Sequence, residues 1–308
     1  MSVSSATAGR SQPDLSVSLA GIQLKNPVIA ASGTFGYGVE FEDVVHLDKL
    51  GGFVVKGLSK EAMTGNPPPR LWETAAGMLN AIGLQNIGAR AFLDEKLPQL
   101  QPMKNIVVFA NVFGYTREDY ERTIQILNEG EGIAAYELNV SCPNTTHGGI
   151  QFGSDPRLLD EVVTTAKRVA RYPLIVKLSP NVTSIAQMAY VAQEAGADAL
   201  SLINTFVAMA IDPETRKPRI ANVTAGLSGP AIKPIALRMV YDAAHAVKIP
   251  VMAWEESRPP PTSLSSCSPG LPRCRLAQPA TGIPVPQRRS WTSCRIGVLN
   301  TTSRGWQT

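Results

Sequence analysis

Short apolar runs alternate with longer amphipathic stretches along the chain as far as about residue 252. The runs cover residues 52–55, 106–110, 134–138, 174–176, 197–203 and 249–252. Runs that are apolar throughout, and not only at every second position, are typical of strands buried on both faces of a parallel sheet. The stretches between them predict helices over residues 89–97, 116–127, 155–171, 183–195 and 231–247.

Six strand–helix units in about 200 residues fit either a (β/α)8 TIM barrel or a doubly wound parallel sheet. No Gly-x-Gly-x-x-Gly motif opens the first helix, which counts against a doubly wound dinucleotide-binding domain. We therefore predict an α/β barrel over residues 15–252, with residues 15–29 forming a hairpin that plugs one end. Residues 1–14 are polar and Ser-rich, so we expect a disordered N-terminus and no secretory signal.

A lysine or an asparagine ends each of the first five apolar runs. These residues are Lys56, Asn111, Asn139, Lys177 and Asn204. Because the carboxyl ends of barrel strands meet at one mouth, where active sites are built, five such residues favour a functional mouth over unrelated strand ends. Amide and ammonium groups together suit a planar, polar, anionic ligand. No Asp, Glu or His belongs to the set and the three histidines are scattered, so we expect no metal site.

Cys142 follows the third run, in a loop rich in Asn, Pro and Gly. It is the only cysteine before residue 254, so we expect no disulfide framework and a cytoplasmic protein. A lone cysteine is often an inert small apolar residue, but a polar loop beyond a strand end favours a reactive base or nucleophile. No stretch of 18 apolar residues occurs, so no membrane-spanning helix is expected.

Three further segments, 31–36, 80–86 and 227–230, are rich in small residues. Such turns allow the backbone to approach a ring or a phosphate closely. The pattern of 80–86 fits an ordinary loop equally well, so the sequence alone leaves both interpretations open.

These segments together resemble dihydroorotate dehydrogenase. The matching motifs, in chain order, are Ala31-Ser32-Gly33, Val55-Lys56-Gly57, 80–86, Asn139-Val140-Ser141-Cys142-Pro143-Asn144, Val176-Lys177-Leu178-Ser179-Pro180-Asn181, Ile203-Asn204-Thr205 and Leu227-Ser228-Gly229-Pro230. Their spacing is similar to that of the class 1 enzymes, which use a cysteine base. The wording is most similar to the 1B form, which works with an iron–sulfur flavoprotein subunit. Seven motifs in order make a chance match improbable.

The resemblance implies FMN across the barrel mouth and oxidation of (S)-dihydroorotate to orotate in de novo pyrimidine (UMP) biosynthesis. Cys142 would remove the proton from C5 while hydride passes from C6 to the flavin. Substrate contacts are implied for Lys56, Asn80, Ala81, Ile82, Gly83, Leu84, Asn139, Asn204 and Thr205. Flavin contacts are implied for Ser32, Lys56, Gly57, Asn111, Asn139, Lys177, Ile203 and Gly229.

The resemblance also implies a homodimer and a partner subunit that carries FAD and a 2Fe–2S cluster and passes electrons to NAD. No nucleic-acid or membrane partner is expected. A fumarate-linked 1A form and a dihydropyrimidine-oxidising relative remain open alternatives. A Schiff-base aldolase that uses Lys177 is a rival from another enzyme class.

The last 55 residues depart from this pattern. Residues 254–308 contain seven Arg, no Lys and only two acidic residues, a charge of +5 within a chain of net charge +4 and pI about 8.9. The basic pI therefore comes from the tail and does not indicate a nucleic-acid partner. The family carries a Gly-Met-Gly-Gly run after its seventh strand, where this chain reads Ala253-Trp254-Glu255-Glu256.

Back-translation offers a cause. One base inserted within the codon of Met252 permits Ile-Gly-Met-Gly-Gly-Ile, and the same frame across residues 275–278 permits Val-Gly-Thr. We hypothesise that one base is missing there, that residues 253–308 are a frameshifted, irregular tail, and that the last two βα units are missing or scrambled. The chain as written is then expected to be insoluble or flavin-free, and an inactive truncated product is the alternative to an active enzyme.

Overall fold

The strand–helix barrel predicted from the sequence is confirmed. The structure, a computed structural model, describes residues 14–41, 45–103, 106–141, 152–256 and 295–300. Eight strands close in the order β10-β13-β14-β3-β4-β7-β8-β9. Seven of them run parallel: β3 (Ile29–Ala30), β4 (Gly52–Val54), β7 (Val108–Val112), β8 (Ile133–Asn139), β9 (Leu174–Lys177), β10 (Ala199–Leu202) and β13 (Val251–Glu256). The sequence pattern missed β3, because two residues are too short for a visible apolar run.

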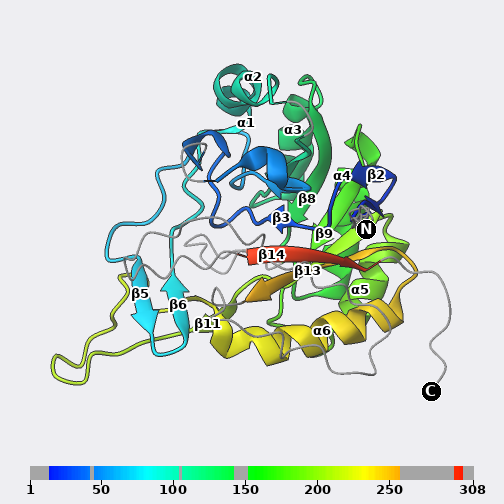
Figure 1. The fold of residues 1–308 in the computed structure, drawn as a ribbon. Coiled ribbons are helices and arrows are strands. Elements are labelled where there is room, and N and C mark those ends of the chain that lie inside the picture. The colour runs from blue at the N-terminus through cyan, green and yellow to red at the C-terminus, as the bar shows by residue number, and fades with distance from the viewer. Residues whose placement is uncertain (1–13, 42–44, 104–105, 142–151, 257–294, 301–308) are drawn as a thin grey trace, which may run out of the picture.

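Helices follow the strands and cover the outside of the barrel (Figure 1). They are α3 (Arg117–Leu127), α4 (Pro156–Val169), α5 (Ile185–Glu194) and α6 (Lys233–Ala246), each within three residues of its predicted bounds. The predicted helix over 89–97 is a continuous segment of α1 (Ala89–Ala91), a π-helical turn (Phe92–Lys96) and α2 (Leu97–Leu100). Short 3-10 turns are η1 (Val39–Phe41), η2 (Leu47–Lys49) and η4 (Pro230–Ile232).

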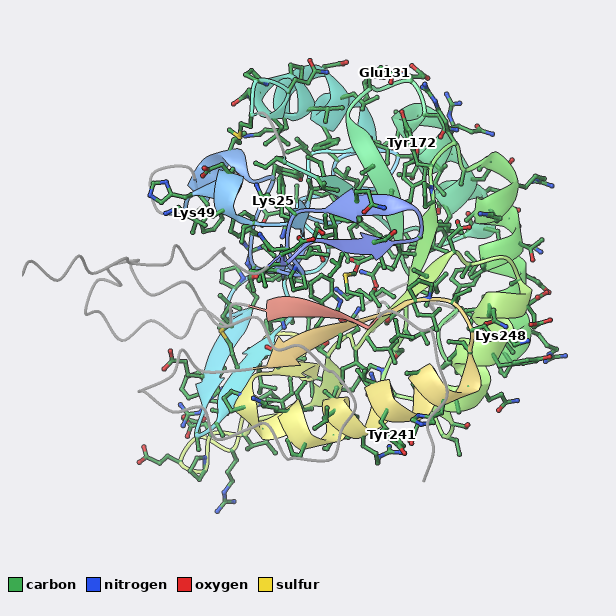
Figure 2. The ribbon with its side chains drawn as sticks, turned by 45° about the vertical axis from the view of Figure 1, so that its right-hand side comes forward. Lys25, Lys49, Glu131, Tyr172, Tyr241 and Lys248 are labelled. Atoms are coloured by element: carbon green, nitrogen blue, oxygen red, sulfur yellow. The ribbon has the colours of Figure 1, made fainter. Side chains whose placement is uncertain are left out.

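Two small sheets lie on opposite sides of the barrel in Figure 1. The hairpin of β1 (Val17–Leu19) and β2 (Ile22–Leu24) packs Leu19 and Leu24 against Phe109 and Ile175 inside the barrel. These partners belong to the amino-terminal halves of their strands, so the predicted plug closes that end. Figure 2 turns this hairpin towards the reader, with Lys25 and Lys49 near it.

The second small sheet has the order β11-β12-β6-β5. Its strands are β11 (Phe206–Ala208), β12 (Ala225–Ser228), β6 (Gly77–Asn80) and β5 (Leu71–Thr74), all antiparallel. β11 begins four residues after β10 ends, so the carboxyl end of the barrel leads directly into this sheet.

The eighth place of the barrel is filled in an unexpected way. β14 (Arg295–Asn300) lies between β13 and β3 and is antiparallel to both. The barrel formed by the described residues therefore has no unpaired edge, and β13 extends to Glu256. Unpaired edges accept any extended segment, because pairing needs only backbone donors and acceptors. Regular TIM barrels are parallel throughout, so β14 is not a regular eighth strand.

Across the described ranges, no helix is both long and apolar enough to span a bilayer. Residues 1–13, 257–294 and 301–308 lie outside the description, so the expectations for the N-terminus and for most of the tail are not tested.

Candidate active site

A buried carboxylate stands at the centre of the carboxyl end of the barrel. Glu137 on β8 is 0% exposed. Its Oε2 accepts a hydrogen bond from Asn111 Nδ2 at 2.6 Å and lies 3.7 Å from Lys177 Nζ. Its Oε1 accepts a hydrogen bond from Ser201 Oγ at 2.9 Å. The neighbouring strands β7, β8, β9 and β10 thus each contribute one polar side chain to a single cluster.

Glu137 does not belong to the set of polar residues that end the apolar runs, because it lies inside one, between Tyr136 and Leu138. Glu137 could have been found from the sequence, because an ionisable side chain inside a strand buried on both faces needs a partner in the interior. In the structure that partner is Lys177.

A second network joins the substrate residues implied by the resemblance. Asn204 Nδ2 donates to Asn139 Oδ1 at 3.1 Å, and Asn204 Oδ1 accepts from the backbone N–H of Thr205 at 2.9 Å. Asn139 Oδ1 also accepts from the backbone N–H of Ser141 at 3.3 Å, and Ser141 Oγ donates to Lys177 O at 3.4 Å. The two networks therefore share one end of the barrel.

The segment 80–84 reaches this network through the small sheet. Asn80 Nδ2 donates to Gly226 O at 3.2 Å, and a Cβ on Gly226 would lie 2.2 Å from Thr205 Oγ1. Asn80 and Thr205 thus contact the same glycine from two sides. Ala81 is buried, while Gly83 and Leu84 have φ of +74° and +57°, a sharp turn that holds the segment in place. The carbonyl of Ile82, between Ala81 and Gly83, accepts a hydrogen bond from the backbone N–H of Asn66.

Lys56 lies at the opposite wall, directly after β4. It lines a pocket of about 380 Å³ together with Tyr37, Met63 and Asn86. Burial, and then the nearby positive charge of Arg70, lower the pKa of the Lys56 ammonium below its usual value of 10.5. The group nevertheless keeps access to a pocket, which is the situation of a cation that receives an anionic ligand. The next residue, Gly57, faces Asn111: a Cβ there would lie 2.9 Å from Asn111 Oδ1.

The remaining predicted residues fall into three groups. Ser32 and Ile203 are buried directly after β3 and β10, at the carboxyl ends of those strands. Gly229 has φ of +107° and packs on the turn of the β5–β6 hairpin, where a Cβ would lie 2.7 Å from Gly77 Cα. Cys142 lies outside the described residues.

Trp254 borders the cluster from the side of β13. The side chain is 2% exposed, and its ring centroid lies 5.2 Å from Lys177 Nζ, a cation–π contact. Among the described residues, two buried side-chain atoms have no hydrogen-bond partner: Trp254 Nε1 and Asn111 Oδ1. Buried polar atoms are normally paired, so the unpaired acceptor of Asn111 within the cluster suits a ligand that brings a donor. No group of three His, Cys, Asp or Glu side chains suited to a metal occurs in the described ranges.

A strand–helix barrel with polar side chains gathered at the carboxyl ends of its strands has the architecture of the barrel enzymes, which build their active sites at that end. Comparison with known families makes this specific. The family model of dihydroorotate dehydrogenase matches residues 14–254. The chain belongs to the dihydroorotate dehydrogenase family, whose members are oxidoreductases, and the resemblance inferred from the motifs is confirmed.

Individual relatives carry two kinds of name. The chain is 65% identical over 240 residues to a protein of Solibacter usitatus provisionally named dihydroorotate dehydrogenase A (fumarate), covering 78% of this chain and 79% of that one. It is 55% identical over 241 residues, with the same coverage, to proteins of Pelobacter propionicus and Geobacter sulfurreducens named dihydroorotate dehydrogenase B (NAD(+)), catalytic subunit.

Among solved structures, a dihydroorotate dehydrogenase of Eimeria tenella in complex with ferulenol is similar, with a TM-score of 0.63 and 22% identity. The match covers 80% of this chain and 73% of that one and shows a shared fold.

Proposed function

We propose that this site oxidises (S)-dihydroorotate to orotate, with FMN as the redox cofactor, in de novo pyrimidine (UMP) biosynthesis. The observation that carries the proposal is the arrangement of the Lys56 ammonium, the linked amides of Asn139 and Asn204, and Asn80 around one end of the barrel. Dihydroorotate presents a carboxylate and ring amides. The ammonium suits the carboxylate, and the amide side chains offer both donors and acceptors to the ring. Family membership favours this reaction over the Schiff-base aldolase.

The residues present fit the flavin ring. An oxidised isoalloxazine ring offers carbonyl oxygens and one imide N–H, and the cluster holds the Lys177 cation and the unpaired acceptor Asn111 Oδ1. We infer that Ser32, Gly57, Asn111, Lys177, Ile203 and Gly229 hold the cofactor. FMN, when bound, accepts the hydride that leaves the substrate. Lys177, which is 4% exposed, would offer the positive charge that stabilises a negatively charged reduced ring.

Cys142 is the proposed base that takes the proton from C5 of the substrate. Both backbone groups of its neighbour Ser141 are held, because the N–H donates to Asn139 Oδ1 and the carbonyl accepts from Asn204 Nδ2 at 3.4 Å. The residue that precedes Cys142 therefore belongs to the amide network. A thiolate is the form that accepts a proton, and backbone donors and nearby cations favour it.

The test is anaerobic flavin reduction by dihydroorotate in the frame-restored protein. Cys142→Ser should slow reduction by about 10²- to 10⁴-fold while FMN stays bound. His147→Asn, in the same loop, is the matched control and should leave the rate nearly unchanged. Undiminished flavin reduction in Cys142→Ser would exclude the thiol as the base. Faster reduction by another dihydropyrimidine would identify that compound as the substrate instead of dihydroorotate.

We further infer that one base is missing near the codon of Met252. Three observations support this: the family match stops at residue 254, β14 is antiparallel in a parallel barrel, and the relatives are nearly as long as this chain although only four-fifths of each is matched. The turns that grip the FMN phosphate would then be missing from the chain as written, which would be inactive. Genomic and cDNA sequence across codon 252 decides this, since a clean, unshifted frame in both would rule out the frameshift.

For the electron acceptor we propose a separate FAD and 2Fe–2S subunit that delivers electrons to NAD. The names of the Pelobacter and Geobacter relatives, which specify NAD(+) and a catalytic subunit, support it. The fumarate name of the Solibacter relative makes fumarate the rival. Fumarate-dependent turnover by the purified chain alone would decide for the rival. A homodimer and a cytoplasmic location remain predictions.

A further inference from the structure

We propose that Glu137 is a positioning residue that fixes the direction of the Asn111 amide, so that this position accepts only a ring offering an N–H. The proposal rests on the proposed flavin site. It assigns a task to a buried carboxylate that neither the substrate network nor the proton transfer uses.

The direction of the amide follows from donor and acceptor chemistry. An ionised carboxylate only accepts hydrogen bonds, so the group that Asn111 turns towards Glu137 Oε2 at 2.6 Å must be its NH2. The amide oxygen then points away from the carboxylate and has no hydrogen-bond partner in the structure. Without Glu137, either end of the amide could face the ligand.

The carboxylate itself is held from two further sides. Ser201 Oγ donates to Oε1 at 2.9 Å, and Lys177 Nζ lies 3.7 Å from Oε2. The side chains of Lys177 and Glu137 are 4% and 0% exposed, so solvent does not compete for either group. A fully buried ion pair with its remaining oxygen hydrogen-bonded keeps one geometry, and this rigidity passes to Asn111.

The approach to Asn111 Oδ1 is open on the side of Gly57. A side chain at residue 57 would begin 2.9 Å from this oxygen, so the absence of a Cβ leaves space there for the edge of a flat ligand. The one N–H of an oxidised isoalloxazine ring is the imide at N3. We infer that this N–H donates to Asn111 Oδ1, which makes Glu137 a determinant of cofactor specificity acting through Asn111.

The experiment compares the frame-restored chain, the parent in this test, with its Glu137→Gln variant, using FMN labelled with ¹⁵N at N3. At equal saturation, the N3–H proton should be protected from exchange in the parent chain and lose much of that protection in Glu137→Gln, because a glutamine amide can either accept or donate and no longer holds the Asn111 amide in one direction. FMN affinity, from quenching of flavin fluorescence, should fall about 10-fold. The matched control is Glu161→Gln, which removes an exposed partner of Arg117 and should change neither.

A ligand-free readout separates this proposal from the proposed function. One side-chain NH2 proton of Asn111, assigned through the Asn111→Ser variant, should be strongly shifted and slow to exchange in the parent chain and ordinary in Glu137→Gln. If FMN fails to bind the parent chain, the flavin function fails for this chain, and the Asn111 signal still tests Glu137.

If Glu137→Gln does not fold, Ser201→Ala keeps the charge pair, frees Oε1, and should weaken FMN binding by about 3-fold with partial loss of N3–H protection. A purely structural role would lower the melting temperature and leave the N3–H signal intact. Unchanged N3–H protection together with an unchanged Asn111 signal in Glu137→Gln would overturn the proposal.

Discussion

The two sides of the barrel mouth differ, because one carries a network of polar side chains and the other is closed by backbone pairing. On the side of β7 to β10, which we call the complete side, four polar side chains form one buried cluster in which Glu137 receives contacts from three strands. The one unpaired atom of this cluster, Asn111 Oδ1, is the acceptor proposed for the flavin ring. On the side of β13 and β14, Trp254 Nε1 is buried without a partner and the last strand runs antiparallel. Closing a barrel needs only backbone hydrogen bonds, whereas building a site needs particular side chains. The side of β13 and β14 closes the barrel but does not supply the side chains of a site.

This difference divides the proposed cofactor site. All six residues proposed to hold the cofactor lie within the part that matches the family, and three of them, Asn111, Lys177 and Ile203, belong to the complete side. In barrels of this type, phosphate is commonly held by backbone N–H groups after strands seven and eight. The family's glycine motifs correspond to residues 253–256 and 275–278, and this sequence has no glycine at either place.

The largest expected effect follows from restoring the reading frame. The frame-restored chain should bind FMN at least about 100-fold more tightly than the chain as written, because it regains the phosphate turns. Fluorescence titration of the apoproteins measures this. Riboflavin, which lacks the phosphate, is the control ligand and should bind both chains with similar affinity. The same ratio of FMN affinity to riboflavin affinity in both chains would contradict the proposed difference between the two sides.

Replacement of Trp254 tests whether β13 is packed as tightly as the complete side. Trp254→Ala should lower the free energy of unfolding by about 3–5 kcal/mol, since it empties a large buried volume beside Lys177. Trp254→Phe should cost clearly less, because it keeps an aromatic ring and removes the unpaired N–H. Urea unfolding of the three proteins gives both values. A loss below about 1 kcal/mol for the alanine variant would mean that the indole is not part of the core.

The sequence predicted most of the complete side and little of the other. Alternating apolar and amphipathic segments indicated the barrel, and the residues after the strands indicated the mouth, because both depend on local pattern. The sequence did not predict the role of Glu137, since that role depends on three strands that come together only in the fold. It did not predict β14 for another reason: the pairing of this strand uses backbone groups, which residue types do not reveal.

The pH dependence of substrate binding probes the complete side at Lys56. Burial and Arg70 lower the pKa of this ammonium, so it loses its proton at a lower pH than an ordinary lysine. Affinity for orotate should therefore fall as pH rises through the lowered pKa, by up to about 10-fold per pH unit. Titrations of orotate from pH 7 to 10 measure the fall, and Lys56→Arg should remove it because a guanidinium stays charged. A flat profile in the parent chain would exclude Lys56 as the anion partner.

In the ligand-free chain the same shift acts on stability with a defined sign. The unfolded state binds the Lys56 proton more tightly than the folded state, so the free energy of unfolding should rise as pH increases from the lowered pKa towards 10.5. Lys56→Met should lack this contribution.

The smallest expected effect asks whether the two sides unfold together. Thr116 Oγ1 accepts from the backbone N–H of Asp119 at 3.1 Å, and Asp119 Oδ2 accepts from that of Thr116 at 3.0 Å, a reciprocal cap at the start of α3. Thr116→Ala should cost about 1 kcal/mol. Unfolding is followed by far-ultraviolet circular dichroism and by tryptophan fluorescence, with Trp254→Phe identifying the signal of Trp254. If the barrel is one cooperative unit, both probes shift by the same amount, because a loss at α3 then destabilises β13 equally. A Trp254 transition that stays in place while the helical signal shifts would show that the β13–β14 side opens on its own, and would make the contrast between the two sides one of stability as well as of chemistry.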